Sequence, residues 1–255
     1  MAPQVIFGTT SLGMPMSASF QDAETVKDPG RVEMLLGENA QLSKKFSVDT
    51  KIFTDTATDG SGDLTKDAID RSTVTSLHRL RREAGNVLHI HRHDPATPLE
   101  EQVRSFNDQI SQGRCKAWAA SNKLVCYQIT RGMEKLLLPL LRDHGIKYNA
   151  FQPLAAGFLT GKLVNNEHSG TRFGDDHPFG PMVRKHFGDE DMTSAMKKFD
   201  VAVKAQGLTP AEVALRWLAH HSSLQDDDGV IIGASKLQQV IDTAGLIRKG
   251  RCQMR

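Results

Sequence analysis

Residues 230–239 read VIIGASKLQQ, an apolar run followed at once by a glycine and then by residues that open a helix. Three consecutive large apolar residues bounded by Gly233 indicate a buried strand. Ser235 suits the N-cap of the following helix, and Lys236 adds a positive charge in its first turn. A strand that leads through a glycine turn into a helix predicts an α/β fold with a parallel sheet.

The same alternation of short apolar runs and longer amphipathic stretches continues through the rest of the chain. Strands are expected at residues 5–7, 46–53, 87–91, 117–122, 146–154 and 230–235. Six strands are fewer than the eight of a (β/α)8 barrel. The pattern therefore predicts either an open parallel sheet or a barrel that has lost parts.

Two helix starts and one long loop stand out between the expected strands. Residues 97–100 (TPLE) and 209–212 (TPAE) each place threonine at the N-cap, proline at the first helical position and glutamate at the third. The apolar residues of 213–218 then indicate an amphipathic helix laid on a sheet. Residues 165–191, rich in Gly, Pro, His and Asp, are expected to form a loop.

Composition favours one soluble domain, covering residues 1–255, in a reducing compartment. A net charge of +2 from 32 basic and 30 acidic residues leaves no basic stripe for nucleic acid or an anionic membrane. Cys115, Cys126 and Cys252 show neither a CxxC spacing nor a disulfide framework. The start lacks the features of a signal peptide, and no run of apolar residues is long enough to span a membrane, so a cytoplasmic location is expected.

A second loop of small residues accompanies the first. Residues 151–162 read FQPLAAGFLTGK and follow the strand expected to end near Leu154. Small residues allow a backbone to approach a pyrophosphate closely, and Lys162 can neutralise its charge. At residues 233–236, a helix N-terminus and Lys236 offer a second place for phosphate, although a plain serine-capped helix would show the same pattern.

Together these two segments resemble the cofactor-binding loops of the aldo-keto reductase family, most closely its aflatoxin-aldehyde reductase branch, in which the first loop reads PLAGGLLTGK. The resemblance implies an α/β fold of the (β/α)8 TIM-barrel type and NADP(H)-dependent reduction of an aldehyde or ketone. It implies that the cofactor phosphates bind along Pro153, Leu154, Ala155, Ala156, Gly157, Phe158, Leu159, Thr160, Gly161, Lys162, Gly233, Ala234, Ser235 and Lys236.

Further segments extend the resemblance over most of the chain. Residues 117–122 (AWAASN) resemble the family's GxSN segment, in which Ser121 and Asn122 would hold the nicotinamide carboxamide. By the same resemblance Gln128 would complete that contact, and Arg172, Gln239 and Thr243 would lie near the mobile loop and the adenosine end. The family has asparagine where this chain has Thr243.

Two catalytic positions are present and two are absent. Residues 48–51 (VDTK) resemble the family's lysine strand and residues 88–91 (LHIH) its histidine strand, which implies that Lys51 and His91 are catalytic. The family's DTAxxYG segment, with its aspartate and its tyrosine acid, is missing at the Asp28/Pro29 junction. A second deletion is expected between Asn122 and Tyr127, and the chain is expected to stop before the segment that closes the substrate pocket, so the barrel is expected to be incomplete.

Three interpretations of function follow. In the first, His91 acts as a replacement acid, because the unperturbed pKa of histidine, about 6.5, is close to working pH. The protein would then be a carbonyl reductase of a natural-product pathway, acting as a monomer or homodimer. Alternatively, the chain is a non-catalytic, cofactor-binding or interaction relative. Third, His89, His91 and His93 alternate as in metal-dependent hydrolases, although further ligands are not evident, and no metal site is predicted.

Overall fold

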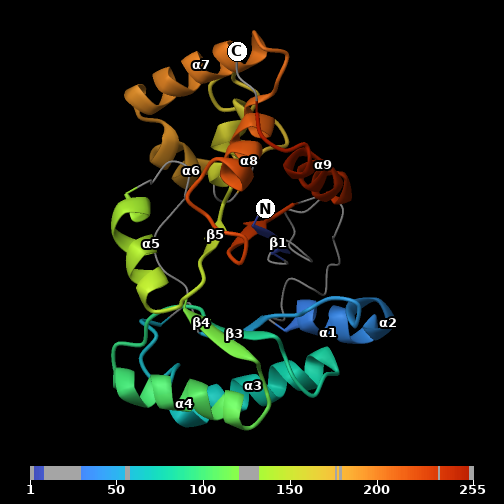
Figure 1. Ribbon diagram of the computed structural model, residues 1–255, viewed down its shortest axis with the longest axis vertical. Coiled ribbons are helices and arrows are strands. Elements are labelled where there is room, and N and C mark those ends of the chain that lie inside the picture. Colours follow the sequence, from blue (N-terminus) through green and yellow to red (C-terminus); the bar gives the residue numbers. More distant parts are fainter. Residues whose placement is uncertain are drawn as a thin grey trace. The chain divides into compact units, whose positions relative to one another are not determined.

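The computed structural model describes residues 3–8, 30–54, 58–120, 132–175, 177, 180–234 and 236–252 (Figure 1). Strands and helices alternate along them, as the sequence predicts. The elements are β1 Gln4–Phe7, α1 Arg31–Glu38, α2 Ala40–Ser43, β2 Thr50–Lys51, α3 Lys66–Leu80, β3 Val87–Ile90, α4 Leu99–Ser111, β4 Ala117–Ala120, α5 Met133–Asp143, β5 Asn149–Phe151, the 3₁₀ helix η2 Ala155–Thr160, α6 Gly180–Phe187, α7 Glu190–Lys204, α8 Pro210–His220, β6 Gly229–Ile232 and α9 Leu237–Arg248.

The chain divides into two compact units. Unit 1 combines Met1–Asp22 with Leu124–Arg255, and unit 2 is the intervening segment Ala23–Lys123. Each unit contains one three-stranded parallel sheet, ordered β1-β6-β5 in unit 1 and β2-β3-β4 in unit 2. The assignment of one domain to residues 1–255 stays a prediction.

In unit 2 the sheet has one apolar and one polar face. Thr50, Leu88 and Trp118 are in register, and the next register row is Lys51, His89 and Ala119. Because side chains alternate along a strand, these rows point to opposite faces. The first face packs against α3 and α4 around Ile52, Ile69, Leu88 and Phe106, all at most 1% exposed, as Figure 1 shows for the two helices. The opposite face therefore carries the charged and imidazole side chains.

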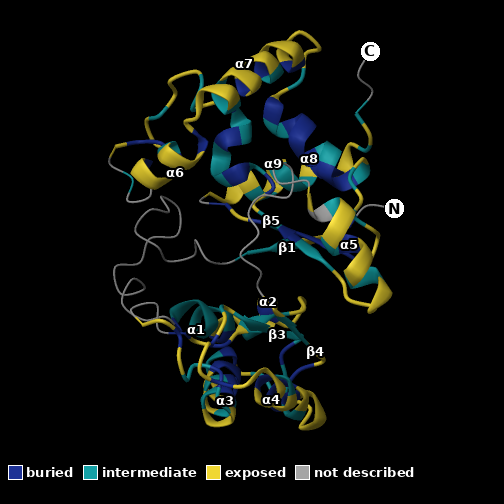
Figure 2. Ribbon diagram, turned by 90° about the vertical axis from the view of Figure 1, so that its left-hand side faces the viewer, coloured by how far each residue is buried: buried dark blue, intermediate teal, exposed yellow. Residues whose placement is uncertain are grey.

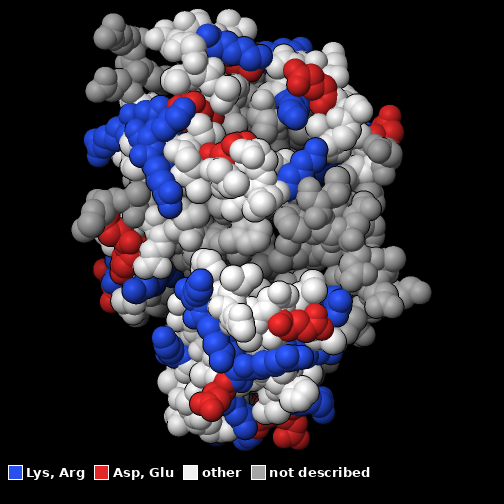
Figure 3. Space-filling view, turned by 90° about the vertical axis from the view of Figure 1, so that its right-hand side faces the viewer, with Lys and Arg blue, Asp and Glu red and all other residues white. Residues whose placement is uncertain are grey.

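In unit 1 the first strand of the chain pairs with the last described strand. β1 and β6 are parallel, as the first and last strands of a closed barrel are. Helices α5, α8 and α9 cover the sheet through a core of Leu138, Ala150, Leu215, Leu218, Val230, Ile232 and Ile247. Figure 2 shows that α8 is the most buried of these helices, whereas α5 and α9 are mainly exposed or intermediate. On the face in Figure 3, Lys and Arg side chains form several separate groups with Asp and Glu among them.

A buried ion pair fixes the amino-terminal side of β5 and β6. The Asp228 carboxylate, fully buried, accepts two hydrogen bonds from the Arg142 guanidinium, at 3.0 and 2.5 Å. It also accepts the backbone N–H groups of Tyr148 and Gln225, each at 2.8 Å. The pair therefore joins α5, the start of β5 and the turn before β6.

The predicted elements are confirmed in number and order for the described residues, with shorter strands, and three details are wrong. Thr97 does not cap α4, because its hydroxyl donates to Asp94 Oδ2 at 2.6 Å and the N-cap is Pro98. Residues 165–191 are not a loop throughout, since α6 lies within them with Val183 and Phe187 buried. The last helix is capped at Lys236, not at Ser235, which lies outside the described residues. At Thr209, by contrast, the predicted cap is confirmed, because its hydroxyl accepts the Glu212 N–H.

Within the described part of the chain, no helix has the length and apolar character needed to cross a membrane.

Candidate active site

Lys51 and His91 lie at the carboxyl ends of adjacent parallel strands. Lys51 is the last residue of β2, and His91 follows Ile90, the last residue of β3. His89 is the register partner of Lys51, and His91, two residues further on, shares its face. Parallel α/β sheets bind substrates at this edge. The structure thus brings the two predicted residues of unit 2 together at the edge where a barrel enzyme has its active site.

The His91 imidazole is held by a residue that the sequence did not single out. Its Nδ1 lies 2.8 Å from the hydroxyl oxygen of Thr54, which is 4% exposed. Partial burial lowers the pKa of His91, and the nearby positive charges of Lys51 and Arg92 lower it further. The imidazole is therefore oriented by Thr54 and favours its neutral form more than a free histidine does.

The charged residues around Lys51 are also ordered. Loss of hydration lowers the pKa of the Lys51 ammonium, although its side chain keeps contact with solvent. Asp49, on the same face, binds His89 Nε2 at 3.3 Å and accepts hydrogen bonds from the Asn86 side chain and the Val87 N–H. Burial opposes ionisation of Asp49, but these bonds outweigh it and lower the pKa of this carboxyl. The sequence VDTK at 48–51 could have indicated Asp49 as a neighbour of the site, since residues two apart in a strand lie on the same face and Asp49 therefore shares the face of Lys51.

Among the described residues, tyrosine does not replace the missing acid. The sequence has two tyrosines, and Tyr127 lies outside the described residues. Burial and the charge of Asp228 raise the pKa of Tyr148 to about 12. A tyrosine acid needs the opposite shift, because only a lowered pKa lets a phenol give up its proton near neutral pH. Tyr148 is therefore a core residue, packed in the cluster around Val230.

The predicted phosphate loops both belong to unit 1 and leave adjacent strands at their carboxyl ends. Phe151, the last residue of β5, is in register with Ile231 of β6, so residues 152–162 and 233–236 start at the same edge of one sheet. Space beside Gly233 is open, with no atom within 4 Å of the position a Cβ would take. Lys162 and Lys236 are both exposed. Open backbone and two exposed lysines at one sheet edge fit a ligand with phosphate groups.

The loop at 153–162 has a defined shape. Its backbone takes positive φ at Ala155, Ala156, Gly157 and Gly161 (51°, 56°, 102° and 81°). Phe158 points inward and stacks on Phe187 of α6, with ring centroids 5.1 Å apart. Thr160 donates from its hydroxyl to the Gly157 carbonyl at 2.7 Å. The loop is thus anchored by its aromatic residue while Lys162 stays in solvent.

Ala156 is strained, because its φ of 56° and ψ of 19° are left-handed values that disfavour every residue with a Cβ. We expect Ala156→Gly to raise the free energy of unfolding by about 0.5–1 kcal/mol. Ala195→Gly, at an exposed position in the middle of helix α7, should lower it by about 1 kcal/mol. Urea unfolding measures both. Equal losses in the two variants would contradict the left-handed conformation at residue 156.

The remaining predicted cofactor residues are only partly placed. Arg172 is exposed in the segment after the loop, and Thr243 is half-buried in α9. Gln239 is the third residue of α9, where its side-chain oxygen accepts the Lys236 N–H at 3.2 Å, so it caps this helix. Ser121, Asn122, Gln128 and Ser235 lie outside the described residues.

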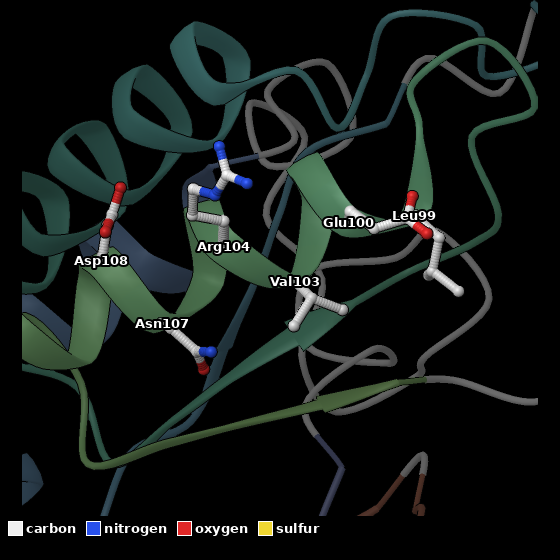
Figure 4. A pocket seen from close by; sticks show the side chains of 6 residues that line it. All are labelled: Leu99, Glu100, Val103, Arg104, Asn107 and Asp108. Carbon is white, nitrogen blue, oxygen red and sulfur yellow. The ribbon is translucent and has the colours of Figure 1, made fainter.

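In the described ranges the three alternating histidines do not form a metal site, and one surface hollow lies apart from the candidate site. No group of three metal-ligating side chains is close enough to hold an ion there, and His89 is bound to Asp49. A surface hollow of about 480 Å³ lies on α4 (Figure 4), and it shares no residue with the candidate site. It is lined by Leu99, Glu100, Val103, Arg104, Asn107 and Asp108.

Parallel βα units, with loops of small residues at one sheet edge and a lysine–histidine pair at another, are features of α/β proteins of the barrel class. The model of the aldo/keto reductase family matches residues 23–131 and 123–249. The chain belongs to the aldo/keto reductase family. The predicted family and the predicted TIM-barrel type of fold are thereby confirmed.

Individual proteins are similar over nearly the whole chain. The oxidoreductase sirO of Leptosphaeria maculans is 26% identical over 300 residues, which cover 98% of this chain and 90% of that protein. Aflatoxin B1 aldehyde reductase member 2 of Mus musculus is 27% identical, covering 98% and 81%. The solved structure of a glycerol dehydrogenase from Gluconobacter oxydans has the same fold, with a TM-score of 0.68 at 22% identity, covering 89% and 75%.

The comparison with sirO also shows internal shortening. About 250 residues of this chain (98% of 255) align over 300 positions, so about 50 positions have no counterpart here. Since both ends of the chain take part in the match, the missing residues are internal. Their placement at the Asp28/Pro29 junction and between Asn122 and Tyr127 stays a prediction.

Proposed function

We propose that the protein reduces an aldehyde or ketone to an alcohol with NADP(H). The observation that carries the proposal is the pair at the carboxyl ends of β2 and β3, where Lys51 is close enough to lower the pKa of His91. The name of the mouse relative makes aldehydes the first substrates to test. A role in natural-product metabolism, a cytoplasmic location and a monomeric or homodimeric state remain predictions.

In this proposal the chain's own residues bind the cofactor, stabilise charge on the carbonyl oxygen and protonate that oxygen. Lys162 and Lys236 would hold the cofactor phosphates, and the reduced nicotinamide, when bound, would supply the hydride. The carbonyl carbon gains that hydride and the C=O π electrons move to oxygen. His91 then donates a proton to that oxygen, so a carbonyl, a hydride and a proton give the alcohol, while the cofactor is left oxidised. Lys51 stabilises the negative charge that develops on oxygen.

The pH dependence follows from the lowered pKa of His91. Only the imidazolium form can give up its proton readily, and that form is populated below the pKa of the group. Because burial, Lys51 and Arg92 all lower this pKa, we expect the reduction rate to be highest below about pH 6.5 and to fall as pH rises through the lowered pKa. Removing one like charge in Lys51→Met should move this fall to higher pH, although the maximal rate decreases. A profile that rises with pH would contradict a histidine acid.

Cofactor binding can be measured without turnover. Unit 1 contains Trp217 and unit 2 contains Trp118, so tryptophan fluorescence and melting temperature both report NADPH binding. We expect Lys162→Met and Lys236→Met each to weaken NADPH binding about tenfold, the loss of one charge-assisted contact of about 1.4 kcal/mol. Lys197→Met, on the exposed side of α7, is the matched control and should bind as the unaltered protein does. No response to millimolar NADPH would contradict the proposal.

A non-catalytic, cofactor-binding role is the second candidate. It is favoured by the missing DTAxxYG segment and by the raised pKa of Tyr148, which leave no tyrosine acid among the described residues. The two candidates differ in one result: a binding protein would respond to NADPH but would not oxidise it in the presence of an aldehyde.

A further inference from the structure

Thr54 lies where it can control the proton on His91. Its hydroxyl oxygen is 2.8 Å from His91 Nδ1. Within the described residues, no side chain or backbone group is a hydrogen-bond partner of the other ring nitrogen, Nε2. The two nitrogens of the ring therefore have different surroundings, and Nε2 is the one that can face a ligand.

The backbone on both sides of this contact is fixed. Ile52 is 1% exposed in the core of unit 2, and the Phe53 N–H donates to Ser72 Oγ of α3 at 2.9 Å. Three residues after His91, the buried Asp94 carboxylate accepts the N–H groups of Gly62 and Leu64. The Thr54–His91 distance is thus set by anchored neighbours.

A hydroxyl suits both charge states of the ring. Threonine has one O–H donor and acceptor lone pairs on the same oxygen. With neutral His91, Thr54 donates to Nδ1, and the ring proton is on Nε2. With the imidazolium, Nδ1–H donates to the Thr54 oxygen, and Nε2 keeps its proton. Nε2 is therefore a donor in both states.

We propose that Thr54 is a positioning residue that keeps a proton on Nε2 of His91, so that the imidazole always presents a donor to the substrate oxygen. The role of Thr54 in catalysis rests on the proposed function. The position of the proton on the His91 ring rests on the geometry alone. The charged groups of the described residues that act on the ring are Lys51 and Arg92. Both are cations, so neither can accept a hydrogen bond from Nδ1 in place of Thr54.

The test is nuclear magnetic resonance of the full chain with ¹⁵N-labelled histidine, at about pH 8, well above the ordinary histidine pKa. The ring signals of His91 are identified by their loss in His91→Gln. We expect the proton on Nε2 in the unaltered protein and in Thr54→Ser, which keeps the hydroxyl. Thr54→Val, which keeps the shape, should show a mixture of tautomers, provided its melting transition shows that it is folded. A proton on Nδ1 in the unaltered protein, or identical spectra in Thr54→Val, would overturn the inference.

Kinetics separates this inference from the proposed function. Thr54→Val should lower kcat for aldehyde reduction about tenfold, part of the 10²–10⁴-fold that a general acid contributes, and Thr54→Ser should stay within about twofold. A fall in Thr54→Ser equal to that in Thr54→Val would overturn the positioning role. If the unaltered protein shows no turnover while the tautomer is as expected, the proposed function fails and the assignment of the proton stands.

Discussion

His91→Gln is expected to lower kcat for NADPH-dependent aldehyde reduction by about 10²–10⁴-fold, the contribution of a general acid. Glutamine keeps a polar side chain of comparable length but cannot give up a proton. The effect is large because Tyr148 has a raised pKa and cannot substitute. The rate is measured as loss of NADPH absorbance with an aldehyde in excess, at the acidic end of the active pH range.

His93→Gln is the matched control. His93 is an exposed imidazole two residues beyond His91, and its replacement should leave the rate within about twofold. If His91→Gln and His93→Gln have equal rates, proton donation by His91 is wrong.

Asp228→Asn is expected to lower the free energy of unfolding by about 3–5 kcal/mol, because it removes the charge of a fully buried carboxylate and leaves the partly buried Arg142 guanidinium without a counter-charge. The carboxylate is fully buried and joins α5, β5 and the turn before β6. A loss of this size is a large fraction of the free energy of unfolding of a typical domain, about 5–15 kcal/mol at 25 °C. Urea unfolding followed by Trp217 fluorescence, in the same unit, measures it.

The neighbouring residue gives a matched control. Asp227 pairs with Lys147 at 3.8 Å, and their side chains are 55% and 64% exposed. Exposed pairs contribute little, so Asp227→Asn should change stability by less than about 0.5 kcal/mol. A loss below about 1 kcal/mol in Asp228→Asn would show that the buried pair does not hold this side of the sheet.

The order of strands and helices was predictable because it depends on local periodicity. The apolar run at 230–232 and its glycine are a strand end in the structure, and the TPAE cap of α8 is present as predicted. The predicted cap at Thr97 is wrong for a tertiary reason. The Thr97 hydroxyl donates to the Asp94 carboxylate, which also accepts backbone N–H groups of Gly62, Leu64, Ala96 and Thr97, and the sequence pattern does not show these hydrogen bonds. Helix α6 was missed because its apolar residues are sparse, and its buried Val183 and Phe187 pack against residues of other elements, Phe158 among them.

The site residues at strand ends could be predicted from the sequence, whereas hydrogen-bond partners that are distant in the sequence could not. Lys51 and His91 follow from alternation and from the resemblance to the family. Thr54 is 37 residues from His91 in sequence, and nothing in the pattern DTKIFT marks its hydroxyl as the partner of an imidazole. The role of Gln239 as a helix cap likewise depends on where α9 begins, and the sequence placed that start one residue early.

The most direct measurement of the proposed function is the transfer of label from NADPH deuterated at the nicotinamide C4 position, on each face in turn, to an aldehyde. We predict that mass spectrometry finds deuterium in the alcohol from one of the two labelled cofactors, in the unaltered protein and at a much lower rate in His91→Gln. An alcohol without deuterium from either cofactor, or no alcohol at all, would contradict carbonyl reduction by this chain.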